Sequence, residues 1–216
     1  MATQTSNFAN FNTLARAGEY SNSSNTFKWI NRTNAQASDN VYASLLISDS
    51  GSNFAPGSVP TAITNETVNY FVITGLSSQV PSGATINGIT IKIERYNSLI
   101  PDANTLTIVD NAIYLTKDGT NTVGNNKSTG ATWQTTDNNT TVDFGGASDL
   151  WGITLTASEV NASTFGVMIS PALTITGGGE TGGDVRIDQV TISVDYTGGT
   201  ARRRAVFSTA AELRTV

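Results

Sequence analysis

The chain has 216 residues, of which 38% are hydrophobic and 13% charged, and its formal net charge is −5. A chain of this length suits one domain that buries a sizeable core without metals or disulfides. It contains no cysteine and no histidine, which excludes disulfides, thiol nucleophiles and Ser-His-Asp or Cys-His catalysis. Any chemistry would therefore depend on carboxylates.

The charge is unevenly distributed along the chain. From residue 198 onward Arg202, Arg203, Arg204 and Arg214 oppose one acid, Glu212, so this segment carries +3 and the remainder −8. A basic segment on an acidic body favours contact with an acidic neighbour, such as another copy of the chain. We do not expect a nucleic-acid partner, because one arginine triplet without interleaved aromatic residues gives a phosphate-binding surface little support.

Residues 1–25 are predicted to form an N-terminal arm. The chain starts without a basic segment and apolar run, so no signal peptide is expected, and no stretch approaches the roughly 20 apolar residues of a membrane helix. Phe8, Phe11 and Leu14, spaced by three, would line one stripe of a short helix. Two readings stay open: an arm that becomes ordered on a partner, or a simple lead-in to the first strand.

The rest of the chain alternates between apolar strand patterns and polar, turn-rich connections. Residues 41–47 are apolar on both sides, which predicts a central strand. Thr156 and Glu159 fit a capping box that opens a helix of one or two turns. The predicted strands cover residues 27–30, 41–47, 67–74, 84–96, 106–115, an edge segment within 133–144, 165–169 and 185–196.

Two long strands dominate this pattern, residues 84–96 and 185–196. Each alternates apolar and polar residues, which is typical of a strand with one face on a core. Each also switches parity once, between Ile86 and Ile89 and between Ile187 and Val190. A regular strand cannot change faces, so the sequence predicts bulges at Asn87-Gly88 and Asp188-Gln189 and an inner position for both strands.

A third parity switch occurs at Asp110-Asn111. It predicts either one strand with a bulge or two strands joined by a tight turn. In total the chain shows about eight strands and almost no helix. The economical solution is an all-β, antiparallel β-sandwich, jelly-roll-like, spanning residues 26–197, with extended arms at 1–25 and 198–216.

The sequence contains five short motifs, which in chain order are Trp29 near Asn34-Ala35, Ser38-Asp39-Asn40-Val41-Tyr42-Ala43, Val80-Pro81-Ser82-Gly83-Ala84-Thr85-Ile86-Asn87-Gly88-Ile89, Asp149-Leu150-Trp151-Gly152 and Asn161-Ala162-Ser163-Thr164-Phe165-Gly166-Val167. In their shared order these motifs resemble a β-sandwich domain of tailed-phage structural proteins and prophage-like bacterial proteins. The resemblance spans roughly residues 29–196 and implies a jelly-roll-like sandwich on a virion, with no catalytic residues to transfer.

Carboxylates are the candidate catalytic or calcium-binding groups of this chain. A glycosidase needs two of them across one cleft, and the candidates are Glu66, Glu94, Asp149, Glu159 and Glu180. Each has a structural explanation, such as a cap or a turn, so we expect no enzyme. Calcium has three candidate segments, none with the spacing of a calcium loop, and no cofactor is assigned. These segments are Asp49-Ser50-Gly51-Ser52-Asn53, Asp137-Asn138-Asn139, and Glu180 with Asp184.

The three tryptophans are candidates for stacking against a sugar. Trp151, flanked by Leu150 and Gly152, is predicted to lie in the core. Trp133 stands among threonine and glutamine, so it is the tryptophan expected to be exposed and to contact a glycan.

The sequence therefore predicts a non-enzymatic structural protein of a bacteriophage virion, such as a capsid-decoration, head-fibre or tail-associated component. We expect a homo-oligomer, with a trimer as the first choice. We also expect contacts with other virion proteins but not with a membrane. The alternative is a carbohydrate-binding or host-adhesion module. The expected partner-binding residues are Phe8, Phe11, Leu14, Arg202, Arg203, Arg204 and Phe207.

Overall fold

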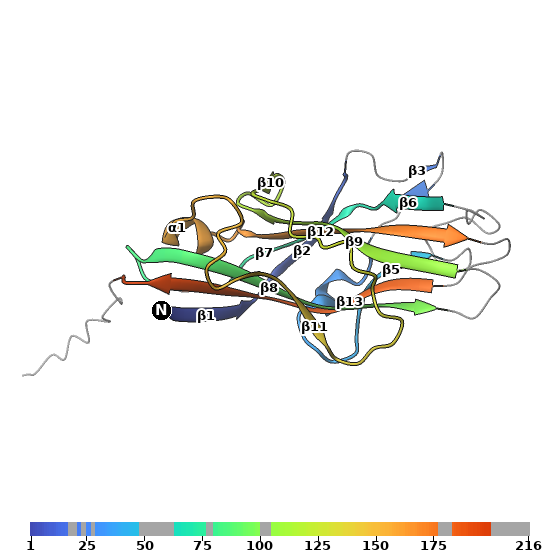
Figure 1. The fold of residues 1–216 in the computed structure, drawn as a ribbon, viewed down its shortest axis with the longest axis horizontal. Coiled ribbons are helices and arrows are strands. Elements are labelled where there is room, and N and C mark those ends of the chain that lie inside the picture. The colour runs from blue at the N-terminus through green and yellow to red at the C-terminus, as the bar shows by residue number, and fades with distance from the viewer. Residues whose placement is uncertain are drawn as a thin grey trace, which may run out of the picture.

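The computed structural model describes residues 1–16, 21–22, 25–26, 29–47, 63–76, 80–99, 105–176 and 183–199. They form an all-β protein with two antiparallel sheets, as the sequence predicts (Figure 1). The elements are β1 (Ala2–Asn7), β2 (Asn10–Leu14), β3 (Ser21–Asn22), β4 (Asn25–Thr26), η1 (Arg32–Ala35), β5 (Ala43–Ile47), β6 (Ile63–Thr67), β7 (Tyr70–Thr74), β8 (Thr85–Leu99), β9 (Thr105–Thr116), β10 (Thr122–Val123), β11 (Thr141–Gly146), α1 (Ala157–Val160), β12 (Gly166–Thr176) and β13 (Gly183–Thr197).

The first sheet contains β1, β13, β8 and β11 in this order, and β5 also pairs with β13. The second sheet contains β10, β9, β12, β7 and β2 in this order, and β6 also pairs with β12. Because β6 and β7 pair with successive parts of β12, they act together as one interrupted strand. The short strands β3 and β4 pair only with each other.

This connectivity is that of a jelly roll. With β6 and β7 counted as one, the strands from β5 to β13 number eight in chain order. Their order is then 1-8-3-6 in the first sheet and 2-7-4-5 in the second, so the chain crosses between sheets at most connections. Eight strands in two Greek keys define this architecture, which confirms the predicted fold class.

The two long strands predicted from the sequence are β8 and β13, and they pair with each other along the first sheet. Asp188 is the extra residue where Ile187 and Gln189 face consecutive residues of β8, and Asn87 is the extra residue near the start of β8. Both predicted bulges are therefore confirmed, as is the inner position of the two strands. In β9 the pairing skips Asn111, so the reading of one strand with a bulge is the right one.

The core lies between the two sheets. Ile89, Ile91 and Ile93 of β8 are fully buried, as their alternation predicts. Trp29 stacks on Phe71 of β7 at 4.9 Å between ring centroids. Large apolar side chains from both sheets therefore meet in one continuous cluster.

The helical stripe predicted for Phe8, Phe11 and Leu14 is wrong, because these residues belong to an extended N-terminal strap, defined here as residues 1–14. In the strap, β1 pairs with β13 of the first sheet, and β2 pairs with β7 of the second. Phe8 lies at the crossing between the two strands and is 3% exposed. A spacing of three fits this crossing as well as it fits a helix.

The central position predicted for residues 41–47 is confirmed only in part. In the described residues β5 pairs with β13 on one side, while its other side has a bridge from Ser44 to Ile30. Of the apolar side chains in this segment, Ala43 and Leu45 are buried, whereas Val41 is 51% exposed. The predicted C-terminal arm lies beyond the described residues from position 200 onward.

Candidate functional site

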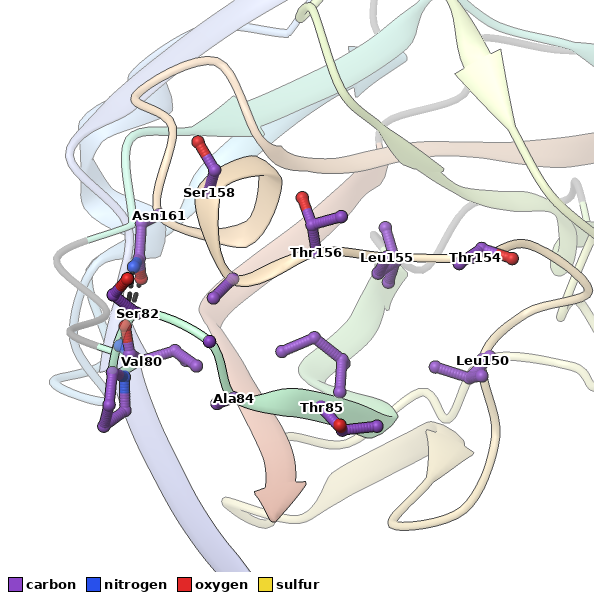
Figure 2. A pocket seen from close by; sticks show the side chains of 14 residues that line it. Val80, Ser82, Ala84, Thr85, Leu150, Thr154, Leu155, Thr156, Ser158 and Asn161 are labelled. Carbon is purple, nitrogen blue, oxygen red and sulfur yellow. Dashed lines mark hydrogen bonds between the residues drawn. The ribbon is translucent and has the colours of Figure 1, made fainter. Parts of the chain in front are cut away.

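A cavity lies at the end of the sandwich where β8 begins, and we call it the end pocket. It has a volume of about 1200 Å³ and is open to solvent. Three of the sequence motifs named above, those at residues 80–89, 149–152 and 161–167, contribute to its walls. Figure 2 shows Ala84 and Thr85 on one side and Thr154, Leu155 and Thr156 on the facing segment. The lining residues are Val80, Pro81, Ser82, Gly83, Ala84, Thr85, Ile86, Leu150, Thr154, Leu155, Thr156, Ala157, Ser158 and Asn161.

Local hydrogen bonds build the two walls. The Asn161 side chain accepts from Val80 N at 3.1 Å and donates to Val80 O at 2.8 Å, as a neighbouring strand would (Figure 2). Thr156 and Glu159 form the predicted capping box, which starts α1. An isolated bridge between Thr85 and Thr156 joins the walls at one end.

The pocket is uncharged. Ile86, Leu155 and Ala157 are buried and provide an apolar floor, whereas Thr85 and Ser158 are exposed at the rim. Its lining includes no carboxylate, lysine, arginine or tyrosine, so it offers no group for acid–base chemistry at neutral pH. Apolar walls with hydroxyl groups at the rim suit a short peptide segment, because a charged ligand would lose water there without gaining a partner.

The motif around Trp151 fixes the segment that leads into the pocket. Asp149 accepts a hydrogen bond from Trp151 N at 2.7 Å and forms an ion pair with Lys127 at 2.6 Å. The indole of Trp151 donates to Ile89 O at 2.9 Å and is fully buried, which confirms its predicted core position. Gly88 permits the backbone of β8 to approach the backbone of Gly146 closely, since a Cβ at position 88 would lie 2.3 Å from the carbonyl oxygen of Gly146.

A second cluster covers the first sheet at the bulge of β13, and we call it the acidic cluster: Asp39, Glu94, Asp137 and Asp188. Asp188 is fully buried and accepts from Asn40 N at 3.1 Å and from Asp39 N at 3.4 Å. Burial raises the pKa of Asp188, these two amides oppose the rise, and the charges of Asp39 and Asp137 add to it.

Glu94 is the neighbour of Asp188 across the two long strands. It is 2% exposed, and its Oε1 has no hydrogen-bond partner in the described residues. Burial raises the pKa of Glu94; a hydrogen bond from Ser38 lowers it, and the charges of Asp188 and Asp137 raise it further. The folded protein therefore favours the neutral form of both buried acids more than water does.

An aromatic pair lies beside the acidic cluster. The guanidinium of Arg186 is 5.0 Å from the Tyr42 ring centroid and donates to Tyr96 Oη at 2.8 Å and to Asp184 at 2.7 Å. The Tyr42 hydroxyl donates to Asp137 at 2.8 Å, and burial is the largest of the causes that raise the pKa of Tyr42. Arg186 is thus neutralised by Asp184 and holds the two rings together.

Among the described residues, the candidate glycosidase carboxylates Glu94, Asp149 and Glu159 each have a separate structural role. Glu94 is buried, Asp149 pairs with Lys127, and Glu159 caps α1 and pairs with Lys117 at 2.8 Å. The Glu66 side chain and Glu180 lie outside what the structure describes.

The candidate calcium-binding carboxylates that the structure describes also have other partners. Asp137 accepts from Asn139 N in a local turn, Asp184 binds Arg186, and the segment at residues 49–53 lies outside the described residues. Within the described ranges no three acidic side chains are placed to hold a metal ion.

The predicted exposure of Trp133 is wrong. Trp133 is 1% exposed, and its indole donates to Asp110 Oδ1 at 2.8 Å. Arg95 pairs with the other oxygen of Asp110 at 2.6 Å, and its guanidinium lies 5.0 Å from the Trp133 ring centroid. The ring therefore has no free face for stacking on a glycan. The burial of Trp133 depends on Asp110 and Arg95, which are distant in the sequence, and the residues next to Trp133 give no indication of it.

The predicted partner-binding residues divide into two groups. Phe8 is buried within the chain's own core, and Phe11 packs against that core with its ring centroid 6.1 Å from that of Phe71. Leu14 is half-buried at the end of β2. The other four, Arg202, Arg203, Arg204 and Phe207, lie outside the described residues.

The chain matches no protein family, no curated protein and no solved structure. In the ranges that the structure describes, no helix has the length and apolar character required to cross a membrane.

Proposed function

We propose that the protein is a non-enzymatic structural component of a tailed-phage virion. It assembles through its terminal segments as a homo-oligomer, for which a trimer is the first choice. The resemblance of its ordered motifs supports the location on a phage particle. The observation that carries the mode of assembly is the N-terminal strap, which adds one edge strand to each sheet of the sandwich.

The strap makes contacts that are suited to exchange between copies. In the described residues β1 pairs with β13 alone, and β2 pairs with β7 alone. Phe8 fills a position in the core between them. If the strap of one copy occupies the same place on a neighbour, every native contact is kept and the two copies become linked. Edge strands add to exposed sheet margins in this way, with backbone hydrogen bonds giving affinity and a buried side chain giving register.

The alternative function is a glycan-binding or adhesion module. The sequence supported it through an exposed Trp133, and that support is lost because the ring is buried under Arg95. No other tryptophan offers a platform, because Trp29 and Trp151 are also buried.

The natural absence of cysteine allows a direct test of strap exchange. Thr5 of β1 and Ser193 of β13 are cross-strand partners, and their hydroxyl oxygens are 2.9 Å apart. Cysteines at both positions, Thr5→Cys with Ser193→Cys, will form a disulfide, since cross-strand partners have the separation that a disulfide requires. With exchanged straps, a non-reducing denaturing gel shows covalent oligomers.

The matched control is Lys92→Cys with Asp143→Cys, which joins cross-strand partners inside one sandwich and should give linked monomers only. Linked monomers from the Thr5–Ser193 pair as well would overturn strap exchange. The virion location is tested separately by mass spectrometry of purified particles from the phage or prophage that encodes the chain. Absence of the protein from those particles would refute that part of the proposal.

A further inference from the structure

The described chain leaves the sandwich at the rim of the end pocket. Thr197 at the end of β13 pairs with Thr85 at the start of β8. Gly198 and Gly199 follow with φ angles of +70° and +94°, a backbone region that favours glycine. At Gly199 a Cβ would lie only 2.8 Å from Pro81 Cβ and 3.1 Å from Ala84 Cβ. The two glycines therefore let the backbone turn directly against one wall of the pocket.

Seventeen residues, 200–216, follow this exit point. They include one run of three consecutive apolar residues that contains an aromatic ring, Ala205-Val206-Phe207. The five residues before this run span at most about 18 Å when extended, so the run can reach the pocket from Gly199.

The chemistry of the pocket matches this run better than it matches the arginines that precede it. The floor of Ile86, Leu155 and Ala157 is buried and apolar, and the lining has no charged side chain to pair with an arginine. Arg202, Arg203 and Arg204 would therefore stay in solvent at the rim, whereas Phe207 would lose contact with water on entering. A volume of about 1200 Å³ is large enough for a short peptide segment rather than a single side chain.

We propose that the end pocket is the docking site for the chain's own C-terminal segment, with Ala205-Val206-Phe207 as the inserted residues. Tethering at the rim favours this occupant over any free ligand, because a short tether gives an effective concentration of about a millimolar. The inference does not depend on the virion assignment or on strap exchange.

Cysteine pairs in the full chain test the proposal. Ser158 is exposed and lines the pocket, and Ser208 follows Phe207 directly. The pair Ser158→Cys with Ser208→Cys should form a disulfide under mild oxidation, identified by peptide mapping after proteolysis. Thr85→Cys, on the opposite wall, replaces Ser158→Cys if that variant folds poorly.

The control pair is Ala37→Cys with Ser208→Cys. Ala37 is exposed and follows Gln36, which bridges to Gln189, eight residues before the end of β13. That distance is about 26 Å along the strand, within the roughly 30 Å that nine extended residues span. A segment that moves freely would thus reach both positions, but Ala37 less often, because the root-mean-square span of nine residues is about 17 Å.

Docking predicts that adding Phe207→Asp slows linkage of the pocket pair at least about tenfold and leaves the rate of the control pair unchanged. A link within one chain or between two chains identifies which copy donates the segment, and either supports the proposal. A pocket pair that links as fast with Phe207→Asp as without it, or an equal slowing of both pairs, would overturn it. Because strap exchange is measured with a different cysteine pair, each idea can fail without the other.

Discussion

The buried ion pair between Arg95 and Asp110 allows a direct test of how polar groups in the core affect the free energy of unfolding. Arg95 is 4% exposed and Asp110 3%, and the two are joined at 2.6 Å between Nη2 and Oδ2. The second oxygen of Asp110 accepts the indole N–H of Trp133 at 2.8 Å. Burial lowers the pKa of Arg95, and Asp110 opposes this by favouring the charged form. Asp110 therefore satisfies a charge and a neutral donor at once.

The variant Asp110→Asn keeps the shape of the side chain but leaves the guanidinium of Arg95 without its counter-charge. Removing one partner of a buried ion pair typically lowers the free energy of unfolding by about 3–5 kcal/mol. Arg95→Met should lower it by a similar amount, because the buried Asp110 then loses its counter-charge and keeps only the Trp133 N–H and the Thr129 hydroxyl as side-chain partners. In the double variant Arg95→Met/Asp110→Leu no buried charge remains, so the main loss is the unpaired indole N–H, about 1–3 kcal/mol.

Urea denaturation followed by tryptophan fluorescence measures these losses. The expected result is a double variant that is much more stable than the sum of the single losses predicts, with a coupling of several kcal/mol. The matched control is Asp143→Asn, which breaks the ion pair with Lys92 where both side chains are about half exposed, and it should change stability by less than about 1 kcal/mol. Additive losses, or a loss from Asp110→Asn as small as that of the control, would refute the reasoning.

Three further predictions concern the acidic cluster, the contact between Gly88 and Gly146, and the N-cap of α1. Burial raises the pKa of Glu94, so the stability that its neutral form contributes is complete below the ordinary pKa and is lost as pH rises through the folded-state pKa. Glu94→Gln should therefore raise the free energy of unfolding more at pH 7 than at pH 4. An equal change at the two pH values would contradict this reasoning. Gly88→Ala should cost about 1–3 kcal/mol in urea melts because its Cβ meets the backbone of Gly146, whereas Gly146→Ala, with nothing within 4 Å, should be near neutral. Thr156→Ala should cost about 0.5–2 kcal/mol by removing the N-cap of α1, as read from thermal unfolding, and a change within experimental error would show that the cap contributes nothing.

The elements that the sequence predicted well are those with a strict local period. Side chains alternate between the two faces of a strand, so any change of parity requires an extra residue, and the bulges at Asn87, Asn111 and Asp188 could be located without coordinates. The capping box at Thr156 depends on residues three apart and was equally predictable.

The predictions that failed depended on contacts between distant parts of the chain. Trp133 has polar neighbours in sequence, yet its environment comes from Arg95 and Asp110 on two other strands. Residues 1–14 carry too few apolar positions to distinguish a helical stripe from two strands that cross between sheets. The position of Phe8 becomes clear only when β7 and β13 are in place as its neighbours.

The end pocket shows why the site was harder to predict than the fold. Its walls come only partly from the motifs quoted for the resemblance, and the lining residues are mostly serine, threonine, alanine and glycine, which form turns in many proteins. Nothing in Asn161 indicates that it pairs with the backbone of Val80, 81 residues away. The two glycines after β13 looked like the end of a domain, whereas in the structure they turn the chain against Pro81 at the pocket rim. The same residues that mark the domain boundary in the sequence thus connect the sandwich to its one basic segment, which is where we place the inserted residues.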